Sequence, residues 1–339
     1  MAASNASASS DRRVLVVSPG WIGDALMALP ALQLFRAENP GVDITMLAKP
    51  GLLPFWELHA APQRRLAVTG TCATTLALLR GGFSAAYLLP NSVRSALLPW
   101  LAAVPERIGL TGSWRRLLLT QEATPPTDAA RQHQAWEYAA VLAPTAQALP
   151  APQLEIPAEA REAALKKIIE LPRPLLGVMP GAARGPAKRW PAERFADAAK
   201  KLRAQLGGSL VIMGGPGDVE ACGVVAAGVG DSAVNLAGTT SLPEWAALLA
   251  QCALVLCNDS GGMHLAAAVG APVVAVFGLT DPARTGPLGV RCRVVQRSAL
   301  RNRAVPRESP EAVAALAAVT ADDVLAAAQE LLKGSAAHA

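Results

Sequence analysis

The chain has 339 residues, enough for two domains of ordinary size; 52% of them are hydrophobic and 17% are charged. This balance is typical of a well-buried globular core and excludes a largely disordered chain. The net charge of +5 suits an acidic ligand such as a sugar nucleotide or a phosphorylated glycolipid. Aromatic residues make up only 4%, and no long Lys/Arg block exists, so we expect no nucleic acid as partner.

Cysteine usage and the N-terminal segment indicate a cytoplasmic protein. The chain has five cysteines, none in a Cys-x-x-Cys pair: Cys72, Cys222, Cys252, Cys257 and Cys292. We expect them to be reduced, small core residues. Residues 1–12 carry neither a basic n-region nor an apolar run, which predicts a disordered tail rather than a signal peptide. The apolar run over 264–280 is interrupted by Gly270 and Pro272, so a buried helix and strand explain it better than a membrane span.

Short β-rich runs alternate with helical patterns through the first half of the chain. The expected strands cover residues 14–18, 43–47, 66–69 and 85–89, and the first expected helix covers 24–38. Alternation at this spacing predicts βαβ units around a parallel sheet.

A less regular region rich in proline follows, with one expected helix over 129–142. We place the domain boundary there, because proline clusters end regular elements. The predicted order is a tail, a first domain, a linker, a second domain, a terminal helix and a second tail, at residues 1–12, 13–157, 158–174, 175–319, 320–333 and 334–339.

The alternation of strands and helices restarts after the linker. Strands are expected at 175–179, 210–213, 253–257 and 273–277, and helices at 191–206, 242–252 and 320–332. Two successive doubly wound halves predict an α/β protein of two Rossmann-like domains, with parallel sheets facing an interdomain cleft that would hold the site. The segment 287–319 looks divergent, and we assign it no role.

The first motif, Ser-Pro-Gly-Trp-Ile-Gly-Asp at 18–24, directly follows the first expected strand. Gly20 and Gly23 would allow a tight turn and a close approach of the backbone to a ligand. The spacing is not Gly-x-Gly-x-x-Gly, which disfavours a nicotinamide dehydrogenase. Asp24 has two interpretations, a first-turn carboxylate favoured by the helix dipole and a general base held at a strand–helix turn.

The second motif, at 180–191, carries the cations Arg184, Lys188 and Arg189 between a strand end and a helix start. It is not a Walker A loop, because the Gly-Lys-[Ser/Thr] ending is absent. One interpretation is a solvated basic loop. The other is a diphosphate clamp in which Lys188 acts as a point charge.

The third motif, Asn-Asp-Ser-Gly-Gly-Met-His at 258–264, lies where a buried strand would end and a helix begin. Free backbone N–H groups and the positive helix end converge at such a point, which suits phosphate. His264 is explained either by helix packing or by a role in the site. The Gly-x-Ser-x-Gly elbow, metal-ligand spacings and an Asp-x-Asp triplet are all absent from the sequence, so we expect neither a serine hydrolase nor a metal ion.

These residues together resemble glycosyltransferase family 9, the lipopolysaccharide heptosyltransferases. The resemblance runs from about residue 14 to about residue 286. Segments 88–96 and 180–191 most resemble the branch that adds the second heptose of the inner core. The matching pieces are Gly-Trp-Ile-Gly-Asp at 20–24, Leu-Leu-Pro-Asn-Ser-Val-Arg-Ser-Ala at 88–96, Pro-Gly-Ala with Gly-Pro-Ala-Lys-Arg-Trp-Pro inside 180–191, and the third motif at 258–264.

The resemblance implies a GT-B fold and an inverting transfer that needs no cofactor. The C-terminal domain would bind ADP-heptose and the N-terminal domain a phosphorylated glycolipid acceptor at the inner membrane surface. By position, Asp24 would be the general base and Lys188 would bind the diphosphate. The other donor-binding residues would be Asp259 for the heptose hydroxyls, Ser260, Gly261 and Gly262 for the phosphates, His264 in support, Thr240 at the adenine and Asp218 at the ribose.

The acceptor residues implied by the same resemblance are Gly20, Trp21, Asn91 and Arg94. The protein would be cytoplasmic, with peripheral association with the inner face of the cytoplasmic membrane left open, as is its oligomeric state. Two alternatives also stay open at this point. One is a family 9 transferase that uses another nucleotide sugar, and the other is a nucleotide-sugar-binding protein without catalysis.

Overall fold

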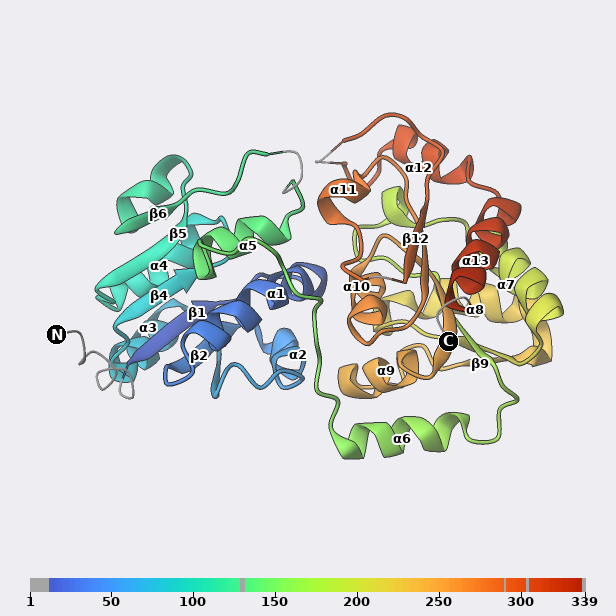
Figure 1. Cartoon of the computed structure of the whole chain (residues 1–339), viewed down its shortest axis with the longest axis horizontal. Coiled ribbons are helices and arrows are strands. Elements are labelled where there is room, and N and C mark those ends of the chain that lie inside the picture. Colours follow the sequence, from blue (N-terminus) through green and yellow to red (C-terminus); the bar gives the residue numbers. More distant parts are fainter. Residues whose placement is uncertain (1–11, 129–131, 290, 303–304, 337–339) are drawn as a thin grey trace. The chain divides into compact units, whose positions relative to one another are not determined.

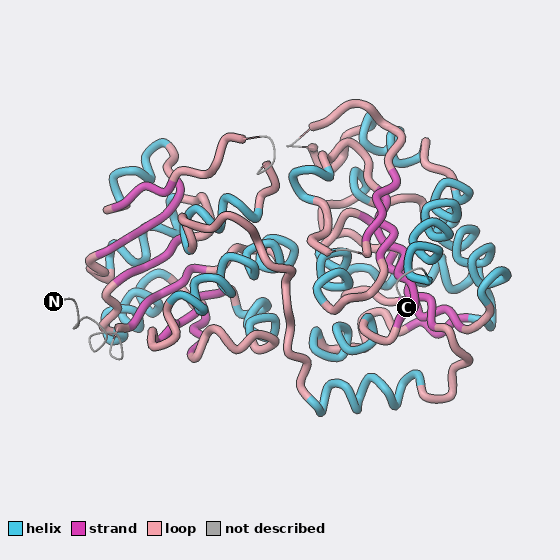
Figure 2. Tube along the Cα trace, viewed as in Figure 1, coloured by secondary structure: helices cyan, strands magenta, loops and turns pink. Residues whose placement is uncertain are grey.

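The computed structural model describes residues 12–128, 132–289, 291–302 and 305–336. The chain divides into two compact units, Met1–Glu155 and Ile156–Ala339 (Figure 1). Each unit has its own parallel sheet with helices on both faces, which confirms the predicted α/β class (Figure 2).

The first unit is built on six parallel strands in the order β3-β2-β1-β4-β5-β6. β1 lies between β2 and β4, and Leu15 is in register with Thr45 and Ala86. Residues 14–17 of β1 are all buried, as expected for a parallel strand covered on both faces. The strands are β1 (Arg13–Val17), β2 (Asp43–Ala48), β3 (Arg64–Ala67), β4 (Ala85–Leu88), β5 (Glu106–Leu110) and β6 (Gln121–Ala123).

The helices of this unit are α1 (Ile22–Glu38), α2 (Leu53–Trp56), α3 (Thr71–Gly81), α4 (Val93–Leu101) and α5 (Ala135–Leu142), with the 3-10 turns η1 (Pro50–Leu52) and η2 (Ser113–Leu118). α1 and α5 pack together on one face of the sheet, where the Phe35 and Tyr87 rings meet edge-on. α3 and α4 lie over the opposite face, against Leu15 and Val17. Side chains along β1 and β4 point alternately to the two faces of the sheet, so each strand packs against both helical layers.

The second unit repeats the same strand order. Its six parallel strands follow the order β12-β11-β10-β7-β8-β9, so the first strand again lies beside the fourth. In both sheets the strand order changes direction at the first strand, which lies between the second and the fourth. α/β proteins bind ligands at the carboxyl ends of the strands beside such a switch point. The strands are β7 (Leu175–Met179), β8 (Ser209–Ile212), β9 (Ala233–Asn235), β10 (Cys252–Asn258), β11 (Val273–Val276) and β12 (Cys292–Val295).

A single large apolar cluster packs α7, α8 and α13 against the second sheet. Its largest side chains are Trp190 and Phe195, whose rings meet edge-on at 4.8 Å between centroids. The helices are α6 (Ala158–Ile168), α7 (Ala192–Leu206), α8 (Val219–Val229), α9 (Leu242–Leu249), α10 (Gly261–Ala268), α11 (Pro282–Thr285), α12 (Pro310–Ala317) and α13 (Ala321–Ala336), with 3-10 turns η4 (Pro186–Lys188), η5 (Pro216–Asp218) and η6 (Gly230–Ser232).

The structure differs from the predicted organisation in several places. The predicted linker 158–174 contains α6, which packs against α9 and belongs to the second unit, so the division falls after Glu155. The divergent segment 287–319 contains β12 and α12. The predicted helix 129–142 begins only at Ala135, because residues 132–134 are described and are not helical, and 129–131 lie outside the described residues. The tail predicted over 1–12 falls, apart from Arg12, outside those residues too, and α13 extends to Ala336 into the predicted second tail.

Candidate functional site

A charged cluster forms where β7, β10 and β11 end in the second unit. Lys188 comes from η4, in the loop that follows β7, Asp259 directly follows β10, and Thr280 follows β11. Lys188 Nζ lies 2.5 Å from Asp259 Oδ2, and the Thr280 hydroxyl donates to the same oxygen at 2.6 Å. The side chains of Lys188 and Asp259 are 13% and 6% exposed. The cluster is therefore a nearly buried ion pair at the edge where an α/β sheet binds ligands.

The basic loop is fixed by Asn258, the fully buried last residue of β10. Its Nδ2 donates to the Pro180 carbonyl at 2.7 Å, and its Oδ1 accepts from the Trp190 N–H at 2.9 Å. Trp190 Nε1 in turn donates to the Val319 carbonyl at 3.0 Å. One amide thus holds both ends of the loop 180–190, and Lys188 is oriented before any ligand binds.

The start of α10 lies beside this cluster in the sequence and requires a small residue. A Cβ on Gly262 would lie 3.0 Å from Met179 Sδ and 3.1 Å from Trp245 Cζ2. Ser260 is the extended N-cap and makes no side-chain capping bond. The first-turn N–H groups of α10 have no intrahelical partner, as at any helix start. His264 is buried one turn further on, at 6% exposure.

Trp245 is a feature that we did not predict. Its indole Nε1 is buried and has no hydrogen-bond partner among the described residues. Buried polar atoms are nearly always paired in native proteins, so an indole N–H left without a partner is a donor that a ligand could use. It comes from α9, which packs against α10.

The two remaining donor candidates lie after β8 and β9. Asp218 Oδ2 accepts from the Gly215 N–H at 3.0 Å, and its carboxyl group lies where a Cβ on Gly181 would be, 2.1 Å away. Asp218 is therefore next to the start of the basic loop. Thr240 is half-buried and precedes Ser241, the N-cap of α9. All predicted donor residues thus belong to the carboxyl edge of the second sheet.

Asp24 is held in the first unit by α5. Gln134 Nε2 donates to Asp24 Oδ1 at 3.0 Å and to the Tyr138 hydroxyl at 2.8 Å. Burial, followed by the nearby Asp24 carboxylate, raises the pKa of Tyr138 well above its usual value. The phenol therefore stays neutral, and Asp24 faces one amide donor and one uncharged hydroxyl.

Lys49, which we did not predict, lies over the Gly20–Trp21 turn. Its Nζ is 5.7 Å from the centroid of the Trp21 ring, within the range of a cation–π contact. A Cβ on Gly20 would lie 3.1 Å from the same Nζ, so Gly20 makes room for the cation. In the sequence, only its place directly after the second strand could have indicated that Lys49 lies near this turn.

Asn91 and Arg94 follow β4, and a buried arginine positions the first of them. Arg115, 1% exposed, donates to Asn91 Oδ1 at 3.1 Å, to the Leu110 carbonyl at 2.9 Å and to the Leu88 carbonyl at 3.1 Å. Burial lowers the pKa of Arg115 from its usual value. This side chain, also not predicted, ties the ends of β4 and β5 together. Arg94 is exposed on the first turn of α4.

The predicted residues therefore form two sets, each on one carboxyl edge. The acceptor set belongs to the first sheet and the donor set to the second. The cleft that we expect between the two edges stays a prediction.

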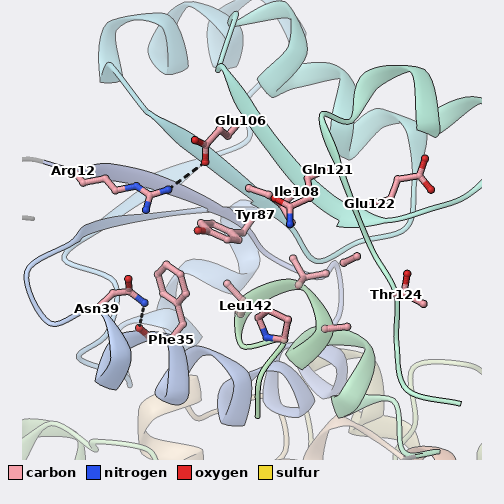
Figure 3. A pocket seen from close by; sticks show the side chains of 14 residues that line it. Arg12, Phe35, Asn39, Tyr87, Glu106, Ile108, Gln121, Glu122, Thr124 and Leu142 are labelled. Atoms are coloured by element: carbon pink, nitrogen blue, oxygen red, sulfur yellow. Dashed lines mark hydrogen bonds and ion pairs between the residues drawn. The ribbon is translucent and has the colours of Figure 1, made fainter. Parts of the chain in front are cut away.

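A pocket of about 430 Å³ in the first unit lies at the opposite edge of its sheet from the predicted acceptor residues (Figure 3). It is lined by Arg12, Glu106 and Gln121, which begin or precede strands, and by Tyr87 and Phe35. The Arg12–Glu106 ion pair, 3.2 Å long, crosses its rim. Because these residues mark the amino ends of β1, β5 and β6, the pocket is not the predicted site.

Metal-binding clusters and membrane-spanning helices are both absent from the residues that the structure describes. Among those residues, no group of three or more His, Cys, Asp or Glu side chains gathers closely enough to hold a metal ion. None of the helices within them combines the length and the apolar character needed to cross a bilayer.

Comparison with known proteins points in one direction. The model of glycosyltransferase family 9 (heptosyltransferase) matches residues 73–312. Lipopolysaccharide heptosyltransferase 2 of Escherichia coli K12 is 32% identical over 84% of this chain and 88% of its own length, and lipooligosaccharide heptosyltransferase 2 of Haemophilus influenzae shows the same figures. The solved structure of E. coli ADP-heptose lipopolysaccharide heptosyltransferase II superposes with a TM-score of 0.82 at 28% identity, covering 96% of this chain and 99% of that one. The match confirms the predicted GT-B fold.

The buried ion pair generates a stability prediction. Lys188→Ala should lower the free energy of unfolding by about 3–5 kcal/mol, because it leaves the Asp259 carboxylate buried without its cation. Lys188→Met combined with Asp259→Asn should recover most of that loss, since Thr280 can still donate to the new amide oxygen. Denaturant titration of the full chain measures both.

The matched control is Lys201→Ala, which removes an exposed lysine paired with Asp197 and Asp322 and should change stability little. If the losses measured for Lys188→Met and Asp259→Asn alone simply add in the double variant, the two side chains do not interact.

Proposed function

Because the chain belongs to glycosyltransferase family 9, we propose that it transfers heptose from ADP-heptose to the inner core of lipopolysaccharide, adding the second heptose onto the first. The observation that carries the proposal is the near full-length similarity to proteins named heptosyltransferase 2. The two strand-end clusters support it, since each supplies one side of a transfer: a cation and helix start for a diphosphate, and a carboxylate for a hydroxyl.

The donor occupies the carboxyl edge of the second sheet in this proposal. Lys188 and the N–H groups of Ser260, Gly261 and Gly262 hold the diphosphate, because a point charge and a helix start both favour anions. Asp259, oriented by Lys188 and Thr280, accepts hydrogen bonds from the heptose hydroxyls. His264 supports the turn, Thr240 faces the adenine, Asp218 holds the ribose, and the indole N–H of Trp245 adds a further donor.

The acceptor occupies the carboxyl edge of the first sheet. Gly20 and Trp21 form its floor, Asn91 is held in place by Arg115, and Arg94 and Lys49 attract the acceptor phosphates. The cytoplasm is the site of the reaction in this proposal, in keeping with five free cysteines. The acceptor lies at the inner surface of the cytoplasmic membrane.

The reaction is a single displacement with inversion. The acceptor oxygen forms a bond to the anomeric carbon while the bond from that carbon to the diphosphate oxygen breaks. Asp24 takes the proton of the acceptor hydroxyl, and the electron pair of the broken bond leaves on ADP. Lys188 and the α10 amides stabilise the growing charge on ADP more in the transition state than in the ground state, and such differential stabilisation raises the rate. No metal ion takes part in this scheme.

A donor panel tests the proposal as a whole. ADP-heptose should raise the melting temperature of the protein, because a ligand that binds only the folded state stabilises it, and UDP-sugars should do so less. ADP should be released only when a heptose-terminated acceptor is added. A thermal shift without ADP release would favour the non-catalytic alternative, and preference for a UDP-sugar would assign another donor.

Asp24→Asn should lower the transfer rate by about 10²–10⁴-fold while ADP binding is retained, since the amide keeps the shape but cannot take a proton. Single-turnover kinetics and calorimetric titration with ADP measure the two quantities. Glu137→Gln, which removes a carboxylate from the first turn of α5, is the matched control and should leave the rate unchanged. Near-normal turnover in Asp24→Asn would remove this residue from the mechanism.

Lys188→Ala should weaken ADP-heptose binding and also lower the transfer rate, because the contact strengthens as charge builds on ADP. Lys188→Arg should rescue only in part, since a planar fork does not replace a compact ammonium. The assay is run at a temperature at which the unfolding curve of the variant shows that it is still fully folded. Arg184→Ala, an exposed cation of the same loop, is the control; equal effects at both positions would indicate a diffuse basic field instead of a lysine contact.

A further inference from the structure

Exposed apolar side chains gather on three elements of the first unit that contact one another in series. They belong to α3, α4 and η2, and we name this patch the α3–α4–η2 surface. η2 carries the two most exposed of them, Trp114 at 79% and Leu117 at 75%. Large exposed apolar groups that lie together usually mark an interaction site. The members are Leu76, Leu79, Val93, Trp100, Leu101, Trp114 and Leu117.

The three elements that carry these exposed side chains are neighbours. α3 packs against α4, and α4 packs against η2 (α3 and α4 are labelled in Figure 1). Leu118 and Leu119 pack inward against the core under α4. Trp114 and Leu117 are three residues apart, a spacing that puts them on the same side of a 3-10 turn. That side is the outward one, as their exposure shows.

The charge of the surrounding segment is one-sided. Between residues 58 and 121 the only carboxylate is Glu106, which is paired with Arg12. The whole chain, by contrast, has 31 Lys and Arg against 26 Asp and Glu. The segment has seven arginines: Arg64, Arg65, Arg80, Arg94, Arg107, Arg115 and Arg116. Arg80 and Arg94 are exposed on α3 and α4. Arg116 is exposed on η2 and is paired at 2.8 Å with Glu122, the carboxylate that follows this segment.

From these observations we infer that the α3–α4–η2 surface binds the anionic phospholipid surface of a membrane. Trp and Leu side chains insert at the level of the lipid headgroups, and arginines beside them bind lipid phosphates. A second copy of this chain is a poor occupant, because two such surfaces would bring like charges together. The inference rests on the proposed function in one respect: a glycolipid acceptor requires the enzyme to work at a membrane.

The test uses the full chain and vesicles that contain no glycolipid. The protein should co-sediment with phosphatidylethanolamine–phosphatidylglycerol vesicles, bind phosphatidylcholine vesicles less, and lose affinity as salt rises. Trp114→Ser combined with Leu117→Ser should weaken binding by about tenfold or more, since two apolar side chains that insert among the lipids are lost. Arg80→Gln should weaken it by about fivefold.

Two controls match these variants in exposure and charge. Ile169→Ser with Leu300→Ser removes side chains that are 75% and 70% exposed in the second unit, and Lys200→Gln removes an exposed cation of α7. Both should bind vesicles like the unchanged protein. Equal loss in the control variants, or no binding of the unchanged protein to anionic vesicles, would overturn the inference.

Two acceptors separate this inference from the proposed function. The Trp114/Leu117 variant should transfer heptose normally to a water-soluble, delipidated acceptor and slowly to the glycolipid in vesicles. Vesicle binding without transfer to the soluble acceptor would leave the surface assigned and contradict the proposed function. The unchanged protein could instead form a dimer, lost in the Trp114/Leu117 variant, and bind no vesicles. That result would assign the surface to a second copy and overturn the inference of membrane binding.

Discussion

The buried ion pair between Lys188 and Asp259 is the constraint on which the second unit's site depends. Two charges at 13% and 6% exposure are costly to bury unless each has a partner with good geometry. The partners come from separate strand ends, so the pair can exist only if β7, β10 and β11 lie side by side. Asn258 enforces that arrangement by holding both ends of the basic loop. The site is thus a product of strand order and not of any single motif.

The first unit also has a buried cation at its strand ends, but this cation is paired with neutral groups. Its buried cation, Arg115, is bound by two strand-end carbonyls and the Asn91 side chain. These partners are neutral, so they accept hydrogen bonds from the two terminal nitrogens of the guanidinium without cancelling its charge, and its buried Nε has no partner among the described residues. The carboxyl edge near Asn91 and Arg94 therefore keeps a positive field, whereas the charge of Lys188 is balanced locally by Asp259. The carboxyl edge of the first sheet therefore suits an acidic ligand, although the buried Arg115 guanidinium itself is inaccessible to it.

Local patterns in the sequence were enough to predict eight of the twelve strands in the described part of the chain, and the three motifs; β5, β6, β9 and β12 were not predicted. Apolar runs bounded by glycine and proline mark β1, β7, β10 and β11, and the turns after them hold Asp24, Lys188 and Asp259. Long-range contacts were not predictable in this way. Lys188 and Asp259 are 71 residues apart, and each was expected to face a ligand, not the other. Thr280, Arg115 and Lys49 were missed because their importance depends on which strand ends are neighbours.

Two of the elements that escaped prediction, α6 and β12, share a physical cause. α6 buries only Ala160, Ala164 and Ile168 against the second unit, so its inward face has small residues and its other positions read as a polar linker. β12 is an edge strand of four residues with only Val295 buried, too short for a clear apolar run. Elements with so little buried surface depend on their neighbours for stability, and single-sequence periodicity is weak there.

The ion pair also bears on how a reaction cycle would end. In the proposed reaction ADP leaves the enzyme with more negative charge than it had as part of the sugar nucleotide. Two anions then compete for the Lys188 ammonium group: ADP and the Asp259 carboxylate, which lies 2.5 Å from Lys188 Nζ. Because the resident carboxylate is covalently tethered, it returns to the lysine without any cost of diffusion. Asp259 would therefore act as an intramolecular competitor that shortens the residence time of the product, so that tight transition-state binding need not slow turnover.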